Sequence, residues 1–377
     1  MDYIKLKDVC TINMGQSPDS DSYNENGNGV PFFQGNADFG ERYPVTRKWC
    51  SAPTKMASPE DILISVRAPI GAMNYAKEEC CIGRGLAALT PNREKVSPEY
   101  IFWLLKGKNE ELNSKGTGST FKAIGRNILE ETLVPDISLE KQAECSIILE
   151  KTYKVISSRK QQLQKLDELV KARFVEMFGA YPLNPMGWKK GTIRDVVADV
   201  RYGSSRPAVD GGKYPYLRMN NITYGGELDL SDVKRIDVPE NELEKCTVRR
   251  GDVLFNRTNS KELVGKTCVY DRDEMMVLAG FVIRVRVNDL VLPEFLSAFL
   301  NTEFSKRTLL GMCKAAIGQA NINAQEMQSI GIYIPPIELQ KEFVQFKNQT
   351  DKSKAAVQKA LDEAQLLFDR LMQDYFG

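Results

Sequence analysis

The stretches VPDISLEKQ at 134–142 and IPPIELQKE at 334–342 resemble each other, and each opens a long run that contains neither proline nor glycine. The two runs, 138–178 and 338–376, are each about 40 residues long. They predict two helices of roughly 60 Å, because an α-helix rises 1.5 Å per residue. The sequence therefore predicts a chain organised around two long helices that have the same entrance.

Apolar residues recur along both runs in steps that alternate between three and four, which is the heptad pattern of a coiled coil. In the second run the expected seam consists of Leu339, Phe343, Phe346, Thr350, Ser353, Val357, Ala360, Ala364, Leu367 and Leu371. In the first run it consists of Leu149, Tyr153, Ile156, Leu163, Leu166, Val170, Phe174 and Met177, and Lys160 interrupts it. We expect the helices to pair antiparallel; the alternative is that each helix packs only on its own domain.

Three further segments recur in the same order, which indicates an internal repeat. LKDV at 6–9 matches IRDV at 193–196, PEDILISVR at 59–67 matches RGDVLFNR at 250–257, and SPEYIFWLL at 97–105 matches LPEFLSAFL at 292–300. The offset between the copies grows from 187 through 191 and 195 to 200 residues at the long runs. We therefore expect two similar globular domains related by a pseudo-twofold axis.

Each copy combines strand-like and helical patterns, so the predicted fold class is α+β. DILISV at 61–66 and VLAGFVIRVRV at 277–287 are typical of strands. A short amphipathic helix is expected after Pro98 and after Pro293, since proline suits the first turn of a helix. The expected limits are 1–137 for the first domain, 138–179 for the first long helix, 180–337 for the second domain and 338–377 for the second long helix.

The composition excludes several chemistries. The chain contains no histidine, so a Ser-His-Asp or Cys-His relay and a histidine-ligated zinc site are impossible. Its eight cysteines form no C-x-x-C pair, and the N-terminal MDYIKLKDV shows no apolar leader segment. The longest apolar run, Met275 to Ile283, is too short to span a bilayer. We expect a reduced, cytoplasmic protein that does not enter a membrane.

Known catalytic and cofactor motifs are incomplete in this sequence. Ser260-x4-Gly265-Lys266-Thr267 lacks the first glycine of a phosphate-binding loop, and its counterpart in the first copy has no Lys-Ser/Thr pair. Asp232-x-Lys234 lacks the upstream part of a nuclease motif, and no Asn/Asp-Pro-Pro-aromatic sequence of an amino-methyltransferase occurs. We expect the chain itself to carry no catalytic residues, no metal and no cofactor.

Side chains that can read DNA bases lie in loops at corresponding places of the two copies. Gln and Asn can bind adenine bidentately in the major groove, and Arg can bind guanine. The candidates are Gln34, Asn36, Arg67, Ser119, Thr120 and Lys122 in the first copy, and Arg218, Asn220, Asn221, Arg257, Asn259, Gln319 and Asn321 in the second. Any one of them suits an ordinary polar loop, but their recurrence in both copies favours contact with DNA. The net charge is only +1, so a basic DNA-binding surface must be local.

Together these features resemble the specificity subunit of type I restriction–modification systems over the whole chain. The resemblance rests on Asp61-Ile62-Leu63 and Asp252-Val253-Leu254, on the helix entrances at 135–142 and 335–342, on the Phe-Gly ends of both helices, and on Asn184-Pro185-x-Gly187-Trp188. It implies two target-recognition domains that each read half of a split, asymmetric site in double-stranded DNA. It also implies that the long helices set the distance between these domains and dock methyltransferase subunits.

The resemblance places the chemistry on partner chains. Two methyltransferase subunits would use S-adenosylmethionine, and a translocating restriction subunit would use ATP and Mg²⁺. This chain would then be a non-catalytic DNA-recognition subunit. The alternative, from another class, is a coiled-coil adaptor that binds other proteins; an enzyme ranks third because the motifs are incomplete.

Overall fold

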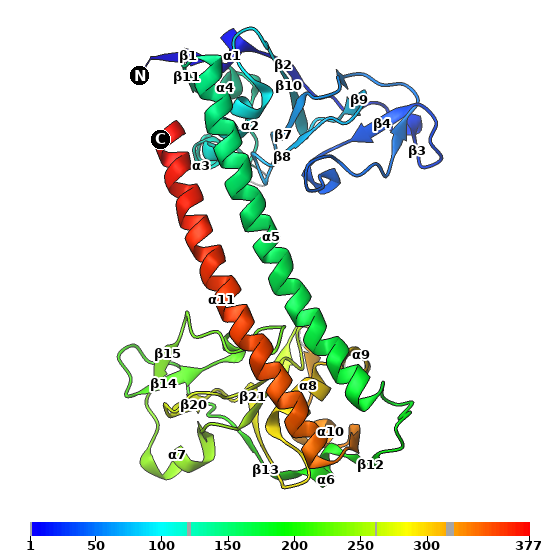
Figure 1. Cartoon of the computed structure of the whole chain (residues 1–377), viewed down its shortest axis with the longest axis vertical. Coiled ribbons are helices and arrows are strands. Elements are labelled where there is room, and N and C mark those ends of the chain that lie inside the picture. The colour runs from blue at the N-terminus through cyan, green and yellow to red at the C-terminus, as the bar shows by residue number, and fades with distance from the viewer. Residues whose placement is uncertain (1, 119–121, 261, 314–319) are drawn as a thin grey trace. The chain divides into compact units, whose positions relative to one another are not determined.

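The computed structural model describes residues 2–118, 122–260, 262–313 and 320–377, and it mixes helices and strands along its whole length (Figure 1). The chain divides into two compact units. Unit 1 comprises residues 1–160 and 359–377, and unit 2 comprises residues 161–358. Each unit contains one globular region and part of each long helix. The α+β class expected from the sequence is confirmed.

Unit 1 is built on two sheets. The first is antiparallel in the order β2-β10-β7-β8, with strands Cys10–Met14, Leu86–Pro91, Ile62–Ser65 and Met73–Tyr75. The second has the order β3-β5-β4-β9-β6, with strands Tyr23–Asn24, Trp49–Cys50, Val30–Phe33, Cys80–Ile82 and Met56–Ala57. The ribbon β1–β11 joins Tyr3–Lys5 to Leu133–Pro135, and the short helices are α1 (Leu6–Val9), α2 (Pro98–Gly107), α3 (Asn109–Ser114) and α4 (Arg126–Glu130).

Unit 2 repeats this plan. Its antiparallel sheet β13-β21-β17-β19 contains Val197–Tyr202, Val282–Val287, Val253–Asn256 and Thr267–Val269. Its second sheet β15-β14-β20-β16 contains Lys234–Ile236, Tyr214–Leu217, Met276–Leu278 and Thr247–Val248. The ribbons are β12–β23 (Lys189–Thr192 with Gly331–Ile334) and β18–β22 (Thr258–Asn259 with Ala320–Asn321). The short helices are α6 (Ile193–Val196), α7 (Glu240–Cys246), α8 (Pro293–Leu300), α9 (Glu303–Met312) and α10 (Ala324–Gln328).

The repeated aspartate of the sequence has the same role in both units. The Asp61 carboxylate accepts the backbone N–H of Ser58 at 2.8 Å, and the Asp252 carboxylate accepts that of Arg249 at 3.0 Å. Each carboxylate is buried and closes the turn that leads into the central strand, β7 or β17. This capping explains why an acidic residue opens both copies of the motif.

One glycine in each unit permits a close approach of two backbones. A Cβ at Gly15, after β2, would lie 2.2 Å from the carbonyl oxygen of Gly83, and a Cβ at Gly203, after β13, would lie 2.3 Å from that of Ala279. No side chain fits in such a space. The turns that follow β9 and β20 are therefore pressed against the ends of equivalent strands.

Two continuous helices of 40 residues confirm the long helices expected from the sequence, with their ends displaced by at most one residue. They are α5 (Leu139–Phe178) and α11 (Ile337–Phe376) (Figure 1). In unit 2 they run antiparallel: the rings of Phe174 and Phe343 have centroids 5.3 Å apart, and the earlier Asp167 binds the later Lys354 at 2.6 Å. In unit 1, Tyr153 of α5 lies with its ring centroid 6.1 Å from that of Phe368 of α11.

Two details of the expected helices are wrong. Both helices begin and end 198 residues apart, so the offset of 200 inferred from VPDISLEKQ and IPPIELQKE is displaced by two residues. In the second half of α11, Lys354, Leu361 and Phe368 occupy the seam positions assigned to Ser353, Ala360 and Leu367, and Leu367 is 51% exposed. A straight helix has 3.6 residues per turn, so a strict heptad pattern drifts around it.

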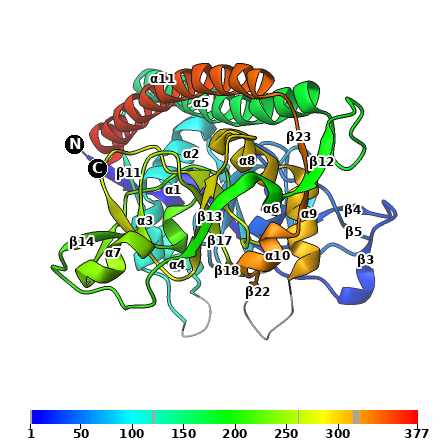
Figure 2. The same cartoon turned by 90° about the horizontal axis from the view of Figure 1, so that it is seen from below.

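The short helix after each repeated Pro-Glu pair joins a sheet to the long helices. In unit 2, α8 packs on β17 and β19 and lies beside α5 and α11 (Figure 2). Phe295 of α8 contacts Phe174 and Phe178 of α5, with centroids 5.5 and 5.0 Å apart. In unit 1, Trp103 of α2 contacts Tyr153 and Phe368 in the same manner. These aromatic cores fix each globular region on the helices.

Candidate nucleic-acid interface

The first recognition loop of unit 1 begins where β4 ends. The Asp38 carboxylate accepts the backbone N–H of Gln34 at 2.8 Å and thereby shapes the turn that includes the 3-10 segment Asn36–Asp38. Gln34 is exposed and Asn36 is partly exposed, so both amides are accessible. The structure thus leaves the two candidate side chains of this loop free to approach a ligand.

A tight turn, Gly83-Arg84-Gly85, lies directly against this loop. A Cβ at Gly85 would be 2.4 Å from the carbonyl oxygen of Gln34, so only glycine permits the contact. Arg84 lies at the exposed tip of the turn. Sequence reasoning missed Arg84, although its position between two glycines and two buried strands is a turn signal.

The other candidates of unit 1 come together from distant segments. Arg67 follows β7, and the neighbouring backbone N–H of Ala68 donates to the carbonyl oxygen of Lys122 at 3.0 Å. Arg67 and Lys122 are both exposed. These two residues give unit 1 a second exposed site of positive charge, besides Arg84. Ser119 and Thr120 lie outside the described residues.

The corresponding loop of unit 2 follows β14. Asn220 is exposed, whereas Asn221 is 2% exposed and its amide is fully engaged with the backbone. Asn221 Oδ1 accepts the N–H of Arg218 at 2.9 Å, and Nδ2 donates to the carbonyl oxygen of Asp229 at 2.8 Å. Asn221 therefore shapes the loop and offers no amide to a base in this conformation. Arg218 is partly exposed and pairs with the Asp232 carboxylate at 2.8 Å.

Arg257, Asn259 and Asn321 meet on the ribbon β18–β22. Arg257 Nη2 donates to Asn321 Oδ1 at 2.9 Å, and its guanidinium lies 5.0 Å from the centroid of the Tyr202 ring. Asn259 is partly exposed on the same ribbon. The bonded Arg–Asn pair holds the guanidinium in one direction, which favours a directional contact with a base edge. Gln319 lies outside the described residues.

The two arginines after the central strands occupy neighbouring positions rather than equivalent ones. The N–H of Ile124 donates to the carbonyl oxygen of Val66, and the N–H of Ile322 donates to that of Arg257, both at 2.9 Å. Arg257 therefore corresponds to Val66, and Arg67 to the next residue, Thr258. The two units place arginine differently on one scaffold.

Several arginines outside the candidate set are neutralised within the chain. Arg42 pairs with Glu150 at 3.2 Å, and Arg206 pairs with Glu242 at 2.7 Å. Arg201 likewise binds Asp199 at 2.8 Å. These ion pairs reduce the positive charge that each unit offers to a nucleic acid. In unit 1, the exposed candidate cations are Arg84, Arg67 and Lys122.

The near match to a phosphate-binding loop forms a structural turn, as expected. Lys266 is 7% exposed, and its ammonium donates to the carbonyl oxygen of Met219 at 2.9 Å. Burial lowers the pKa of Lys266. Its ammonium therefore anchors the recognition loop of unit 2 instead of facing a phosphate.

The structure offers no support for a metal centre or a membrane span in the parts that it describes. Residues 2–118, 122–260, 262–313 and 320–377 contain no group of three or more side chains suited to hold a metal ion. Within the same ranges, no helix is both long and apolar enough to cross a bilayer.

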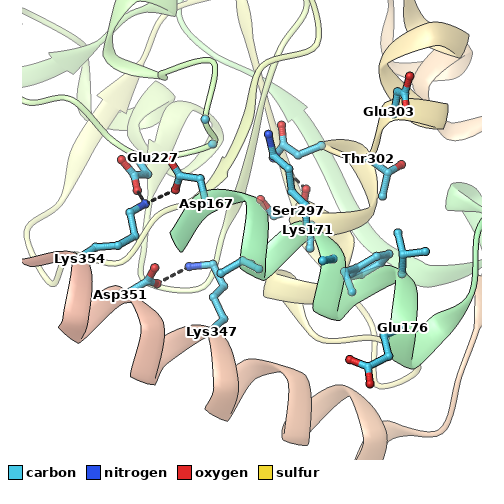
Figure 3. A pocket seen from close by; sticks show the side chains of 18 residues that line it. Asp167, Lys171, Glu176, Glu227, Ser297, Thr302, Glu303, Lys347, Asp351 and Lys354 are labelled. Carbon is cyan, nitrogen blue, oxygen red and sulfur yellow. Dashed lines mark hydrogen bonds and ion pairs between the residues drawn. The ribbon is translucent and has the colours of Figure 1, made fainter. Parts of the chain in front are cut away.

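A cavity of about 700 Å³ opens in unit 2 beside α5, α8 and α11 (Figure 3). Its walls combine apolar side chains with charged ones, and Lys354 extends from α11 to the carboxylates of Asp167 and Glu227. Burial lowers the pKa of Lys354, but the two carboxylates outweigh burial and raise it. Lys347 pairs with Asp351 in the same wall at 2.5 Å. This wall joins the loop around Glu227 to both long helices.

The chain belongs to a known family. It matches the family described as type I restriction modification DNA specificity domain over residues 1–168 and 185–364. The two matched stretches follow the internal repeat, with one stretch on each copy. The family resemblance expected from the sequence is confirmed.

Similar proteins and structures agree with this assignment. The chain is 41% identical over 160 residues to a putative type I restriction enzyme MjaX specificity subunit from Methanocaldococcus jannaschii; the aligned stretch covers 42% of this chain and 38% of that protein. It is 22% identical over 340 residues to the EcoKI specificity subunit of Escherichia coli, covering 84% and 73%.

Two solved structures share the fold over the whole chain. The S subunit of a type I restriction-modification system from M. genitalium matches with a TM-score of 0.58 at 12% identity, covering 100% of this chain and 96% of that one. A chain from a study of complex assembly and conformational transition of the type I R-M system matches with a TM-score of 0.60 at 19% identity, covering 100% and 97%. At these identities the likeness concerns the fold.

Proposed function

We propose that this chain is the DNA-recognition subunit of a type I restriction–modification complex and reads a bipartite, asymmetric site in double-stranded DNA. One observation carries the proposal: two copies of one scaffold each present exposed or partly exposed polar side chains that suit base edges, in a chain of the DNA specificity family. Gln34 and Asn36 represent unit 1, and Asn220, Arg257 and Asn321 represent unit 2. Because these side chains differ between the units, the two half-sites should differ in sequence.

The proposal assigns the chemistry to partner chains. Two methyltransferase subunits that use S-adenosylmethionine would dock on the long helices, and a restriction subunit that uses ATP and Mg²⁺ would join for cleavage. The chain would work in the cytoplasm, bind no cofactor itself and have no catalytic role. Family membership supports this division and disfavours a general coiled-coil adaptor.

Methylome sequencing tests the proposal. A strain that expresses the chain with its methyltransferase subunit should acquire one split methylated motif, and a strain without the chain should lack it. Exchange of residues 1–137 for the corresponding domain of another specificity subunit should change one half of the motif only. A methylation pattern that is the same with and without the chain contradicts the proposal.

A further inference from the structure

The turns after β9 and β20 have the same backbone but present different exposed side chains. In unit 1 the N–H of Val66 donates to the carbonyl oxygen of Gly85 at 2.9 Å; in unit 2 the N–H of Arg257 donates to that of Phe281 at 3.0 Å. The strand ends packed against these turns are equivalent, because Gly15 and Gly203 lie against them in the same way. The internal repeat thus permits a direct comparison of the two turns.

Phe281 faces solvent although its side chain is large and apolar. It is 52% exposed, and among the described residues it is the only exposed phenylalanine. Its backbone is bonded to Arg257, whose guanidinium in turn binds Asn321 and lies over Tyr202. A large exposed apolar side chain next to this group of polar candidate residues suggests a surface that becomes buried on binding.

The corresponding turn of unit 1 has a polar tip. Arg84 is exposed, and the flanking glycines press the turn against the backbone of Gln34. Each turn therefore lies beside candidate base-reading residues of its own unit, Gln34 in one case and Arg257 in the other. The exposed residues occupy neighbouring positions of the turn, because Phe281 corresponds to Gly85 and Arg84 corresponds to Gly280. One turn backbone thus presents different exposed side chains in the two units, as two domains need in order to read different sequences from one scaffold.

We propose that these two turns are specificity-determining contacts with DNA. Arg84 donates to the N7 and O6 acceptors of a guanine in the half-site read by unit 1. Phe281 packs against the 5-methyl group of a thymine in the half-site read by unit 2. Both contacts follow from major-groove chemistry, in which arginine suits guanine and apolar side chains suit the thymine methyl. The inference rests on the proposed function and adds the residues that select one base pair in each half.

Binding selection with the intact complex tests the Phe281 contact. The chain, assembled with its methyltransferase subunits, is offered duplexes in which each half-site is randomised in turn. With Phe281→Ala, the preference for thymine at one position of the second half-site should fall by roughly 3- to 5-fold, as for the burial of one methyl group. The first half-site should keep its sequence. Met275→Ala is the matched control, because Met275 is also exposed (46%) but lies at the opposite end of β20.

Removal of the thymine methyl group tests whether Phe281 contacts that group. Replacement of the selected thymine by uracil removes only its methyl group. This replacement should weaken binding by the wild-type complex and have no further effect on the Phe281→Ala complex. Phe281→Leu should retain part of the thymine preference, since leucine is still apolar.

The Arg84 arm has its own readout. Arg84→Ala should weaken the preference for guanine at one position of the first half-site only. Arg84→Lys should keep only part of this preference, since lysine lacks the bidentate fork of arginine. If the wild-type complex selects a split site and both turn variants select the same site with the same strength, the turns do not read bases and the proposed function stands. If the wild-type complex selects no sequence at all, the proposed function itself fails.

Discussion

Gln142 and Gln340 make the same three hydrogen bonds in the two units. Gln142 Oε1 accepts the N–H of Ser97 at 2.9 Å, and its Nε2 donates to the carbonyl oxygens of Lys95 at 3.1 Å and Ile137 at 2.9 Å. Gln340 has equivalent bonds to Leu292, at 2.8 Å, and to two carbonyl oxygens at 3.1 and 2.9 Å. Both side chains are at most 1% exposed. Each amide ties the start of a long helix to the loop that precedes α2 or α8.

Loss of either amide should destabilise its own unit. Gln340→Ala leaves one N–H and two carbonyl groups without a partner, so we expect unit 2 to lose about 2 to 4 kcal/mol. Gln142→Ala should do the same in unit 1. Hydrogen exchange followed by mass spectrometry would show which unit opens. Gln345→Ala, at an exposed position of α11, should change neither unit; equal opening of both units by Gln340→Ala would contradict the assignment.

The Lys354 brace should position the recognition loop of unit 2. Lys354 binds Asp167 and Glu227, and Asp229 in the same loop contacts Asn221 through two hydrogen bonds. Lys354→Met should therefore weaken selection in the second half-site by about 1 to 2 kcal/mol, the loss of a charge-assisted contact. Lys354→Arg should restore most of it. Binding assays with single base changes measure the effect, and an equal loss in both half-sites would assign Lys354 a general structural role.

The base-reading side chains should divide between the half-sites. Arg257→Ala should relax one position of the second half-site by about 1 to 3 kcal/mol, the value of a good bidentate contact. Gln34→Ala should relax a position of the first half-site by a similar amount. We expect smaller effects for Arg218→Ala, because this guanidinium already binds Asp232. Methylation mapping is the measurement. If a substitution changes both half-sites alike, the substituted residue does not read a base.

The helices should act as a ruler. Duplication of the heptad Leu163 to Leu169 lengthens α5 by about 10 Å and keeps its seam in phase. DNA advances about 34 Å in roughly ten base pairs, so the gap between the half-sites should grow by about one to three base pairs. Both half-sequences should be retained. Methylation mapping of a folded, active variant with an unchanged gap would show that another feature sets the distance.

Lys106 should make the stability of the folded chain depend on pH in the alkaline range. Its ammonium lies 3.8 Å from the centroid of the Tyr153 ring, and burial lowers its pKa from 10.5 to about 8. Between these two values the folded chain has released a proton that the unfolded chain still holds, so this contribution to stability rises with pH. The difference in unfolding free energy between wild type and Lys106→Met should therefore shift in favour of wild type by up to about 3 kcal/mol from about pH 7 to about pH 10. Urea unfolding of both proteins across this range is the test, and parallel pH profiles would contradict it.

Some site residues could be found from the sequence and others could not. Gln34, Asn220 and Arg257 belong to loops whose type and position recur in both copies, and the structure leaves all three accessible. Asn221 has the same residue type as Asn220 but points inward to bind the backbone. Arg84 lies on a short turn whose neighbour, Gln34, is far away in the sequence. The two glycines beside Arg84 signal a turn, but no local pattern shows that this turn lies beside Gln34 or that Asn221 turns inward, because both depend on what the rest of the chain packs against.

Local signals in the sequence were enough to predict the α+β class, the internal repeat and, to within one residue, the ends of both long helices. Proline and glycine end helices, apolar spacing identifies their buried faces, and a repeated motif such as the Asp61 and Asp252 turn needs few neighbours to form. Packing in the folded chain set the drift of the α11 seam from Leu367 to Phe368 and the side chains that face outward. Both depend on packing between segments distant in the chain, where a shift of one residue changes which side chain is buried.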